Sequence, residues 1–229
     1  SGRVMCFSPE ADLVAGVVVS GVGIDALRHV KQTREYPLAV LPLLLGVHLL
    51  VEAYVWWGEA GRVPEYVGQT ATWVYLAFAL GVLPVLVPGA ILAIEPDGRR
   101  RRWLMPFVLV GAGVAAMYMA GVITGPVSAG IKGCCLSYDS GPGHTPLLGF
   151  LYVVVTCFPL LFSSHRAVVA FGAVNLVAVP FIGWLLAGGF ASVWCAWAAI
   201  TSVLVALHLR RVRLPGTRQP PICSDRVVG

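Results

Sequence analysis

Apolar segments of about 20 residues dominate the chain, and short polar stretches separate them. A helix of about 20 apolar residues is long enough to cross the hydrocarbon core of a bilayer. By this criterion the sequence predicts seven transmembrane helices, at residues 11–28, 37–57, 71–94, 103–124, 146–163, 167–188 and 190–209. We therefore expect an all-α polytopic membrane protein, folded as a seven-helix bundle.

Little of the chain remains for a soluble domain. Residues 5–212 are expected to form one membrane domain, and the Pro-rich residues 213–229 a disordered cytoplasmic tail. Residues 1–4 precede Met5 and are interpreted as a remnant added for expression, so we expect the natural start at Met5.

Composition supports this assignment, because 58% of the residues are hydrophobic, 12% are charged and the mean hydropathy is +0.82. Soluble domains carry about 25% charged residues. Most Lys and Arg residues fall in alternate loops, above all in Arg99–Arg102, and after the last span. The positive-inside rule then predicts an outward N-terminus and a cytoplasmic C-terminus in a multi-pass plasma membrane protein. The net charge of +5 is explained by lipid headgroups, without nucleic acid.

The outer side is expected to carry a loop over about 125–145 that is rich in turn residues. It is either a lid over the outer mouth of the bundle or a plain connector. Cys6, Cys134 and Cys135 are also expected on this side, where a bridge from Cys6 to either of the other two is chemically allowed. Their spacing does not establish a bridge, and no His or Met accompanies the adjacent pair to indicate a soft-metal site.

Glu52 is the leading candidate for chemistry, because an ionisable group inside a span is costly unless it has a function or a partner. His48 precedes it by four residues and so shares its helical face. Two interpretations stay open. The pair either ties helices together or acts as an acid and base in a cavity.

Aromatic side chains gather at the same depth. All tryptophans except Trp103 fall in the outer half of the predicted bundle. An aromatic belt at the membrane interface is one explanation, but a belt populates both interfaces. The alternative is an aromatic-walled pocket that binds substrate, formed by Trp56, Trp73, Tyr75, Tyr118, Trp194 and Trp197.

Glu10 and Asp12 lie where the first span begins, after Ser8 and Pro9. An ordinary helix start explains them, with Ser8 as the cap and acidic residues favoured by the helix dipole. Because they enter the membrane at the level of Glu52, they are also candidates for a second catalytic carboxylate.

A second group of polar residues is expected at the cytoplasmic ends of the helices. Asp25, His29, His165 and His208 are of types that bind zinc, but juxtamembrane His residues commonly meet headgroups instead. Neither Lys31 nor Lys132 lies within a span, which excludes a retinal Schiff base. We expect no metal and no cofactor.

Three stretches of sequence carry a resemblance: residues 5–12 (MCFSPEAD), His48 to Glu52 with Trp56, and residues 192–199. They resemble an actinobacterial family of seven-span membrane proteins over nearly the whole membrane part. In size, span number and placement of acids, the chain also resembles small bacterial membrane-bound terpene cyclases of meroterpenoid biosynthesis. It departs from the pattern in the outer loop, where residues 134–138 replace a His-containing stretch.

The resemblance implies a reaction in which an acid protonates a terminal alkene or epoxide and ring closure follows, without a metal. The leading hypothesis is therefore a membrane-bound cyclase of a hydrophobic prenylated small molecule. Glu52 would be the acid, Glu10 or Asp12 the second carboxylate, and His48 the residue that tunes Glu52. The alternatives are a lipid-binding, sensing or transport bundle without chemistry, and a zinc-dependent membrane hydrolase.

Overall fold

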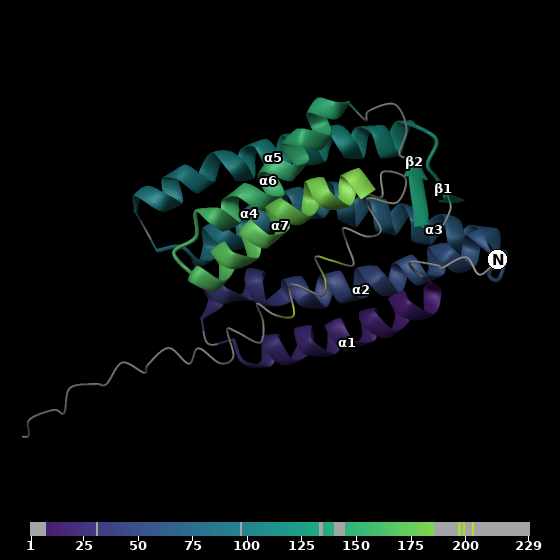
Figure 1. Cartoon of the computed structure of the whole chain (residues 1–229), viewed down its shortest axis with the longest axis horizontal. Coiled ribbons are helices and arrows are strands. Elements are labelled where there is room, and N and C mark those ends of the chain that lie inside the picture. Colours follow the sequence, from purple (N-terminus) through teal and green to yellow (C-terminus); the bar gives the residue numbers. More distant parts are fainter. Residues whose placement is uncertain are drawn as a thin grey trace, which may run out of the picture.

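The computed structural model describes residues 8–30, 32–96, 98–132, 135–139 and 145–185, together with 197, 199 and 203. Within these residues the chain is mostly helical (Figure 1). The predicted 213–229 tail, the 1–4 remnant, Trp194 and His208 lie outside them.

The first two helices form an antiparallel pair along one side of the molecule (Figure 1). Helix α1 is Pro9–Arg28 and α2 is Tyr36–Glu59, with a short 3₁₀ turn, η1, at Thr33–Glu35. Ser8 caps α1 by accepting a hydrogen bond from Ala11 N at 3.2 Å, and Pro9 occupies the first turn. The expected start of the first helix is therefore confirmed.

Small residues allow α1 and α2 to pack closely. Gly16, Gly23 and Gly46 lie at the contact, and a Cβ atom on any of them would clash with the opposite helix. Gly58 of α2 meets Gly68 of the next helix in the same way. Without a hydrophobic force between helices in lipid, such close backbone approach is a main source of association.

The next segment is one long helix with an irregular centre. Helix α3 is Glu65–Leu76, the π-helix η2 is Ala77–Val82 and α4 is Leu83–Ile94. Pro84 begins α4, which agrees with the preference of proline for the first helical turn. The predicted 71–94 span is thus the greater part of a helix that begins at Glu65.

Helix α5 is Arg99–Thr124, α6 is Pro146–Leu161 and α7 is Arg166–Leu185. The four consecutive arginines at 99–102, expected in a loop, form the first turn of α5 instead. Between α5 and α6, strands β1 (Ser128–Lys132) and β2 (Cys135–Asp139) pair antiparallel. This hairpin was not predicted, because the 125–145 segment was interpreted as a lid or connector without regular structure.

In the part of the chain that the structure describes, three helical segments are long and apolar enough to cross a membrane: Thr33–Glu59, Glu65–Ile94 and Arg99–Thr124. Helix α1 does not join them, because it carries Glu10, Asp12, Asp25 and Arg28. Pro146–Leu161 and Val168–Val179 are shorter apolar helices. A membrane protein is therefore supported by length and composition, but seven spans are not.

Candidate functional site

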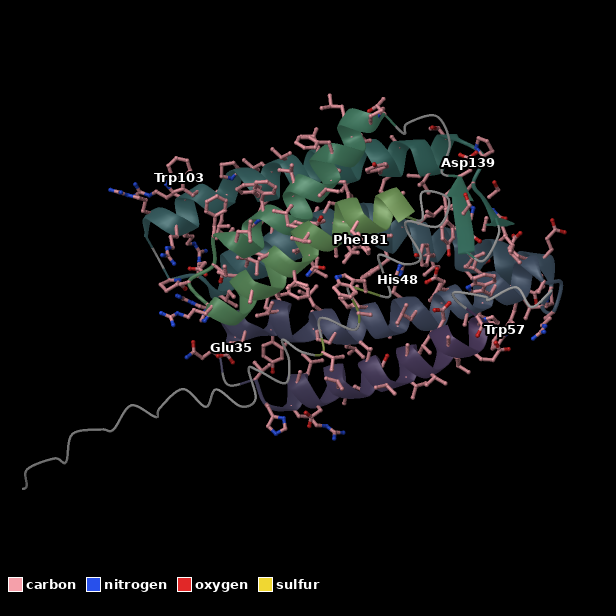
Figure 2. All side chains as sticks on the ribbon, viewed as in Figure 1. Glu35, His48, Trp57, Trp103, Asp139 and Phe181 are labelled. Atoms are coloured by element: carbon pink, nitrogen blue, oxygen red, sulfur yellow. The ribbon has the colours of Figure 1, made fainter. Side chains whose placement is uncertain are left out.

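Helix α2 presents three polar or aromatic side chains on one buried face. His48, Glu52 and Trp56 follow one another at intervals of four residues, so they lie one above the other along the helix. Their exposed fractions are 3%, 0% and 4%. Figure 2 places His48 inside the bundle, whereas Trp57 and Trp103 lie toward opposite ends of the molecule. The sequence prediction that Glu52 and His48 share a face is confirmed.

A stack of rings from three elements surrounds this face. The His48 ring stacks on Tyr75 of α3, with centroids 4.0 Å apart and an interplanar angle of 19°. Tyr75 stacks in turn on Tyr138 of β2, at 4.4 Å and 11°. The Tyr138 hydroxyl donates a hydrogen bond to Glu52 Oε1 at 3.3 Å. The buried Glu52 carboxyl group is therefore contacted by the phenol at one end of this stack.

Asp12 joins this cluster from α1. Its side chain is 1% exposed, and the Trp56 indole lies beside its carboxyl group. The close α1–α2 packing at Gly16 and Gly46 brings the two helices together on this side. Glu10 and Asp12 were the two candidates for a second carboxylate. Of these, Asp12 lies beside Trp56, which is one helical turn from Glu52 on α2.

Glu10 lies elsewhere. It is exposed, and its Oε1 is 3.8 Å from the Arg62 guanidinium in the α2–α3 connection. Hydrogen bonds from its own backbone and from Ser8 hold the pKa of Glu10 below its usual value, and Arg62 contributes in the same direction. The structure thus places Glu10 at the surface, as an ordinary first-turn acid of a helix.

The predicted pocket wall divides into separate groups. Trp56 and Tyr75 belong to one buried cluster, against which Trp73 packs. Tyr118 belongs to another cluster, where it meets Tyr152 edge to face at 6.1 Å. Trp197 packs against a third group around Cys157. The predicted wall is therefore not one group: Trp56, Tyr75 and Trp73 pack together, whereas Tyr118 and Trp197 belong to other clusters.

The π-helix adjoins the cluster and was not predicted. Phe78 of this segment lies 4.8 Å from the His48 ring. A π-turn leaves backbone groups without their usual helical partners, and the Tyr152 hydroxyl donates to Ala79 O at 2.8 Å. Such turns in helices are frequent at functional sites.

The comparison with protein families gives one match. The profile of a family of unknown function, DUF6629, matches residues 5–220. The chain belongs to this family. No curated protein and no solved structure matches the chain. The DUF6629 match includes every element that surrounds Glu52.

Of the zinc-binding residues considered for this DUF6629 protein, the structure describes Asp25, His29 and His165, and these three do not form a metal site. His29 Nδ1 lies 2.7 Å from the Asp25 backbone oxygen and 3.6 Å from Asp25 Oδ1, within one turn of α1. His165 lies in the α6–α7 connection. Among the side chains that the structure describes, no three His, Cys, Asp or Glu residues form a possible metal site. Cys6 and Cys134 lie outside the described residues, so the proposed disulfide stays a prediction.

Another buried carboxylate in the DUF6629 chain, in addition to Glu52 and Asp12, was missed. Glu95 follows α4 and is 0% exposed. Its Oε1 accepts hydrogen bonds from Ser163 Oγ at 2.8 Å and from Ser164 N at 2.7 Å, just before α7 begins. The adjacent Pro96 made this position resemble a loop in the sequence. Ser163 and Ser164 are 68 and 69 residues from Glu95, so only the tertiary structure shows these contacts, which we call the Glu95 anchor.

Proposed function

We propose that this chain is a membrane-bound cyclase in which the Glu52 carboxyl group protonates a prenylated, lipophilic substrate. The observation that carries the proposal is the complete burial of Glu52 beside stacked His48, Tyr75 and Tyr138 rings. A carboxylic acid shielded from water is suited to donate a proton at neutral pH. The resemblance to small membrane-bound terpene cyclases points to the same chemistry.

The proposed reaction starts when Glu52 gives its proton to a terminal alkene or epoxide of the substrate. In an alkene the π bond opens as a C–H bond forms, and in an epoxide a ring C–O bond breaks as an O–H bond forms. A second double bond attacks the resulting carbocation and closes a ring. Aromatic faces stabilise a cation placed over them, and Trp56 is the candidate to supply such a face. The cation then loses a proton, so the product is an isomer of the substrate. Exclusion of water prevents its capture as an alcohol.

An apolar surface groove between α2 and α3 supports a lipophilic substrate. Its volume is about 290 Å³. It is lined by Val51, Tyr54, Tyr66, Val67, Thr70, Ala71 and Val74. Ala71 also belongs to the buried cluster of Trp56 and Tyr75, so the floor of the groove adjoins the candidate site. We propose that a prenyl chain approaches from the lipid along this groove.

The decisive experiment incubates purified protein in detergent or lipid nanodiscs with farnesylated phenols and indoles. Conversion gives a product of unchanged mass and altered chromatographic retention. Glu52→Gln is expected to lose this conversion, and Glu95→Gln, a matched change of another buried carboxylate, is expected to keep it. Full turnover by the Glu52 variant would exclude the mechanism.

The same groove favours a second candidate, a lipid-binding, sensing or transport bundle without chemistry. This alternative predicts that native mass spectrometry detects a bound, unaltered lipid, and that none of the prenylated compounds is converted. Replacing Ala71 or Val74 with Trp would fill the groove, and loss of the bound lipid in these variants would favour this second function.

The proposed membrane arrangement has seven spans in the plasma membrane, with the N-terminus outside and the C-terminus in the cytoplasm. The arginines that begin α5 would then meet the cytoplasmic headgroups, and the hairpin would lie on the outer side. Reporter fusions test this arrangement. A reporter inserted after Lys132 is expected to be active only outside the cell, and one at the C-terminus only in the cytoplasm.

A further inference from the structure

The β-hairpin carries a side chain directly into the candidate site. Residues two apart on a strand point to the same face, and on β2 these are Leu136 and Tyr138. Leu136 is 0% exposed and belongs to the buried cluster of Trp56 and Tyr75. Tyr138 packs against that cluster and contacts Glu52. One face of β2 is thus part of the wall of the site.

The hairpin is fixed at its base and along its length. Gln69 of α3 donates from Nε2 to the Val127 backbone oxygen at 3.0 Å, just before β1. Tyr138 is opposite Ala129 in the antiparallel register, close to the base of the hairpin. The Tyr138 hydroxyl is therefore held by backbone pairing as well as by its ring contacts.

The ring stack connects the two polar residues of α2. Tyr138 contacts Glu52 through its hydroxyl and stacks on Tyr75, and Tyr75 stacks on His48, one turn before Glu52. Stacked rings restrict one another's rotation, and the hydroxyl position follows from the ring position. The hydrogen bond to Oε1 is consequently part of a rigid arrangement drawn from α2, α3 and β2.

We propose that Tyr138 is a positioning residue, which orients the Glu52 carboxyl group and stabilises the carboxylate left after proton transfer. This inference rests on the proposed function. In the reactive step the Glu52 O–H bond breaks and the substrate C–H bond forms, so that negative charge develops on the carboxylate. The Tyr138 O–H bond stays intact and its hydrogen bond to Oε1 strengthens, since bonds to charged acceptors are shorter and stronger. The proton released by the cyclised cation restores the acid.

Tyr138→Phe tests this role because it removes the hydroxyl and keeps the ring. We expect kcat to fall about 10- to 100-fold, toward the lower range for loss of one preorganised donor, with KM within about twofold of wild type. Tyr152→Phe is the matched control, because it removes a hydroxyl that donates to a backbone oxygen, at Ala79. It is expected to retain kcat. Equal losses in the two variants would overturn the proposal, because they would indicate a general effect on packing.

A second measurement does not depend on turnover. The infrared difference between wild type and Glu52→Gln isolates the carboxyl C=O band of Glu52, and Tyr138→Phe is expected to shift this band, whereas Tyr152→Phe is not. An unchanged band would overturn the role of Tyr138. If no prenylated compound is converted while the band shifts, the proposed function fails but the Tyr138–Glu52 contact stands.

Gln69→Ala provides an independent variant that keeps Tyr138 itself. Loss of the Gln69 hydrogen bond loosens the base of the hairpin, so kcat and the carboxyl band are expected to change in the same direction as in Tyr138→Phe, by a smaller amount. Wild-type values of both kcat and the band position in Gln69→Ala would contradict the claim that the hairpin base holds the hydroxyl in place.

Discussion

Two buried carboxylates of this protein are held in different ways. Glu95 accepts bonds of 2.8 and 2.7 Å from a serine hydroxyl and a backbone N–H, just before α7 begins. These two bonds fix the Glu95 carboxyl group between the end of α4 and the α6–α7 connection. Glu52 accepts a bond of 3.3 Å from the Tyr138 hydroxyl, and the Tyr138 ring stacks on Tyr75. Glu52 is the carboxyl group that we propose as the proton donor.

This difference separates a structural role from a chemical one. Glu95 connects the end of α4 to the α6–α7 connection, so its substitution should lower the free energy of unfolding. Glu52 contacts Tyr138 of the hairpin and shares a face of α2 with His48, so its substitution should lower kcat. The following variants test whether the two carboxylates divide in this way.

The largest expected effect is on turnover. A positioned general acid contributes about 10²- to 10⁴-fold, so Glu52→Gln is expected to lower kcat by about that factor. Glu95→Gln should stay within about threefold of wild type, since a side-chain amide oxygen can still accept both hydrogen bonds. Steady-state assays of the two variants on the same prenylated compound give the comparison. Similar losses in both would remove the distinction between them.

The second effect is on stability. Glu95→Ala leaves the buried Ser163 hydroxyl without its acceptor, and we expect it to cost about 2–3 kcal/mol. Thermal unfolding in detergent measures this loss. Ser163→Ala is the comparison variant, which removes the Ser163 bond to Glu95 and the bond that His165 N donates to Ser163 Oγ, and it is expected to cost about 1–2 kcal/mol. A melting temperature unchanged in Glu95→Ala would show that the anchor contributes nothing to the fold.

A packing variant of α1 tests the connection between Asp12 and the Glu52 side of the bundle. A Cβ atom at Gly23 would clash with the Leu43 backbone, whereas one at Gly21, half a turn away, meets open space. Gly23→Ala is expected to destabilise by about 1–3 kcal/mol. Gly21→Ala should be neutral or slightly stabilising, because alanine favours helix. The two melting curves decide the matter, and equal shifts would contradict close α1–α2 packing.

The smallest effect is expected at Glu10. The backbone and Ser8 hydrogen bonds, with a smaller contribution from Arg62, depress the pKa of Glu10. These contacts therefore stabilise the fold above the ordinary pKa of a glutamate, and their contribution is lost as the pH falls through the lowered value. Because both side chains are exposed, Glu10→Gln should leave the melting temperature unchanged at neutral pH within experimental error. A large loss of turnover in Glu10→Gln would restore this residue as the second carboxylate.

The sequence predicted the α2 part of the site because its information is local. An intramembrane acid, a histidine four residues before it and a tryptophan four residues after it define one face of a helix. The sequence also indicated that Glu10 or Asp12 lies near the site, because both acids begin the first predicted span at the level of Glu52. Which of the two turns inward depends on helix rotation, and α1 has apolar residues on all sides apart from its ends.

The remaining parts depend on contacts between distant residues. Tyr138 is 86 residues from Glu52, and the turn-rich segment around it gave no alternation that indicated a hairpin. Glu95 is followed by Pro96 and resembled a loop residue until Ser163 was placed against it. Tyr118 and Trp197 were assigned by depth alone, and depth does not specify the neighbour that a ring on a lipid-surrounded helix will contact.

The π-helix between α3 and α4 holds one extra residue in this part of the chain. A π-turn accommodates one residue more than a regular helical turn, so the residues that follow it keep the direction that they would have in an uninterrupted α-helix one residue shorter. Deletion of a single residue within Ala77–Val82 would let regular winding resume and would leave Leu83–Ile94 facing the same way relative to Tyr75. Homologous chains one residue shorter between Tyr75 and Glu95 are therefore expected to keep both the Glu52 and the Glu95 contacts, with regular α-helix in place of the π-turn.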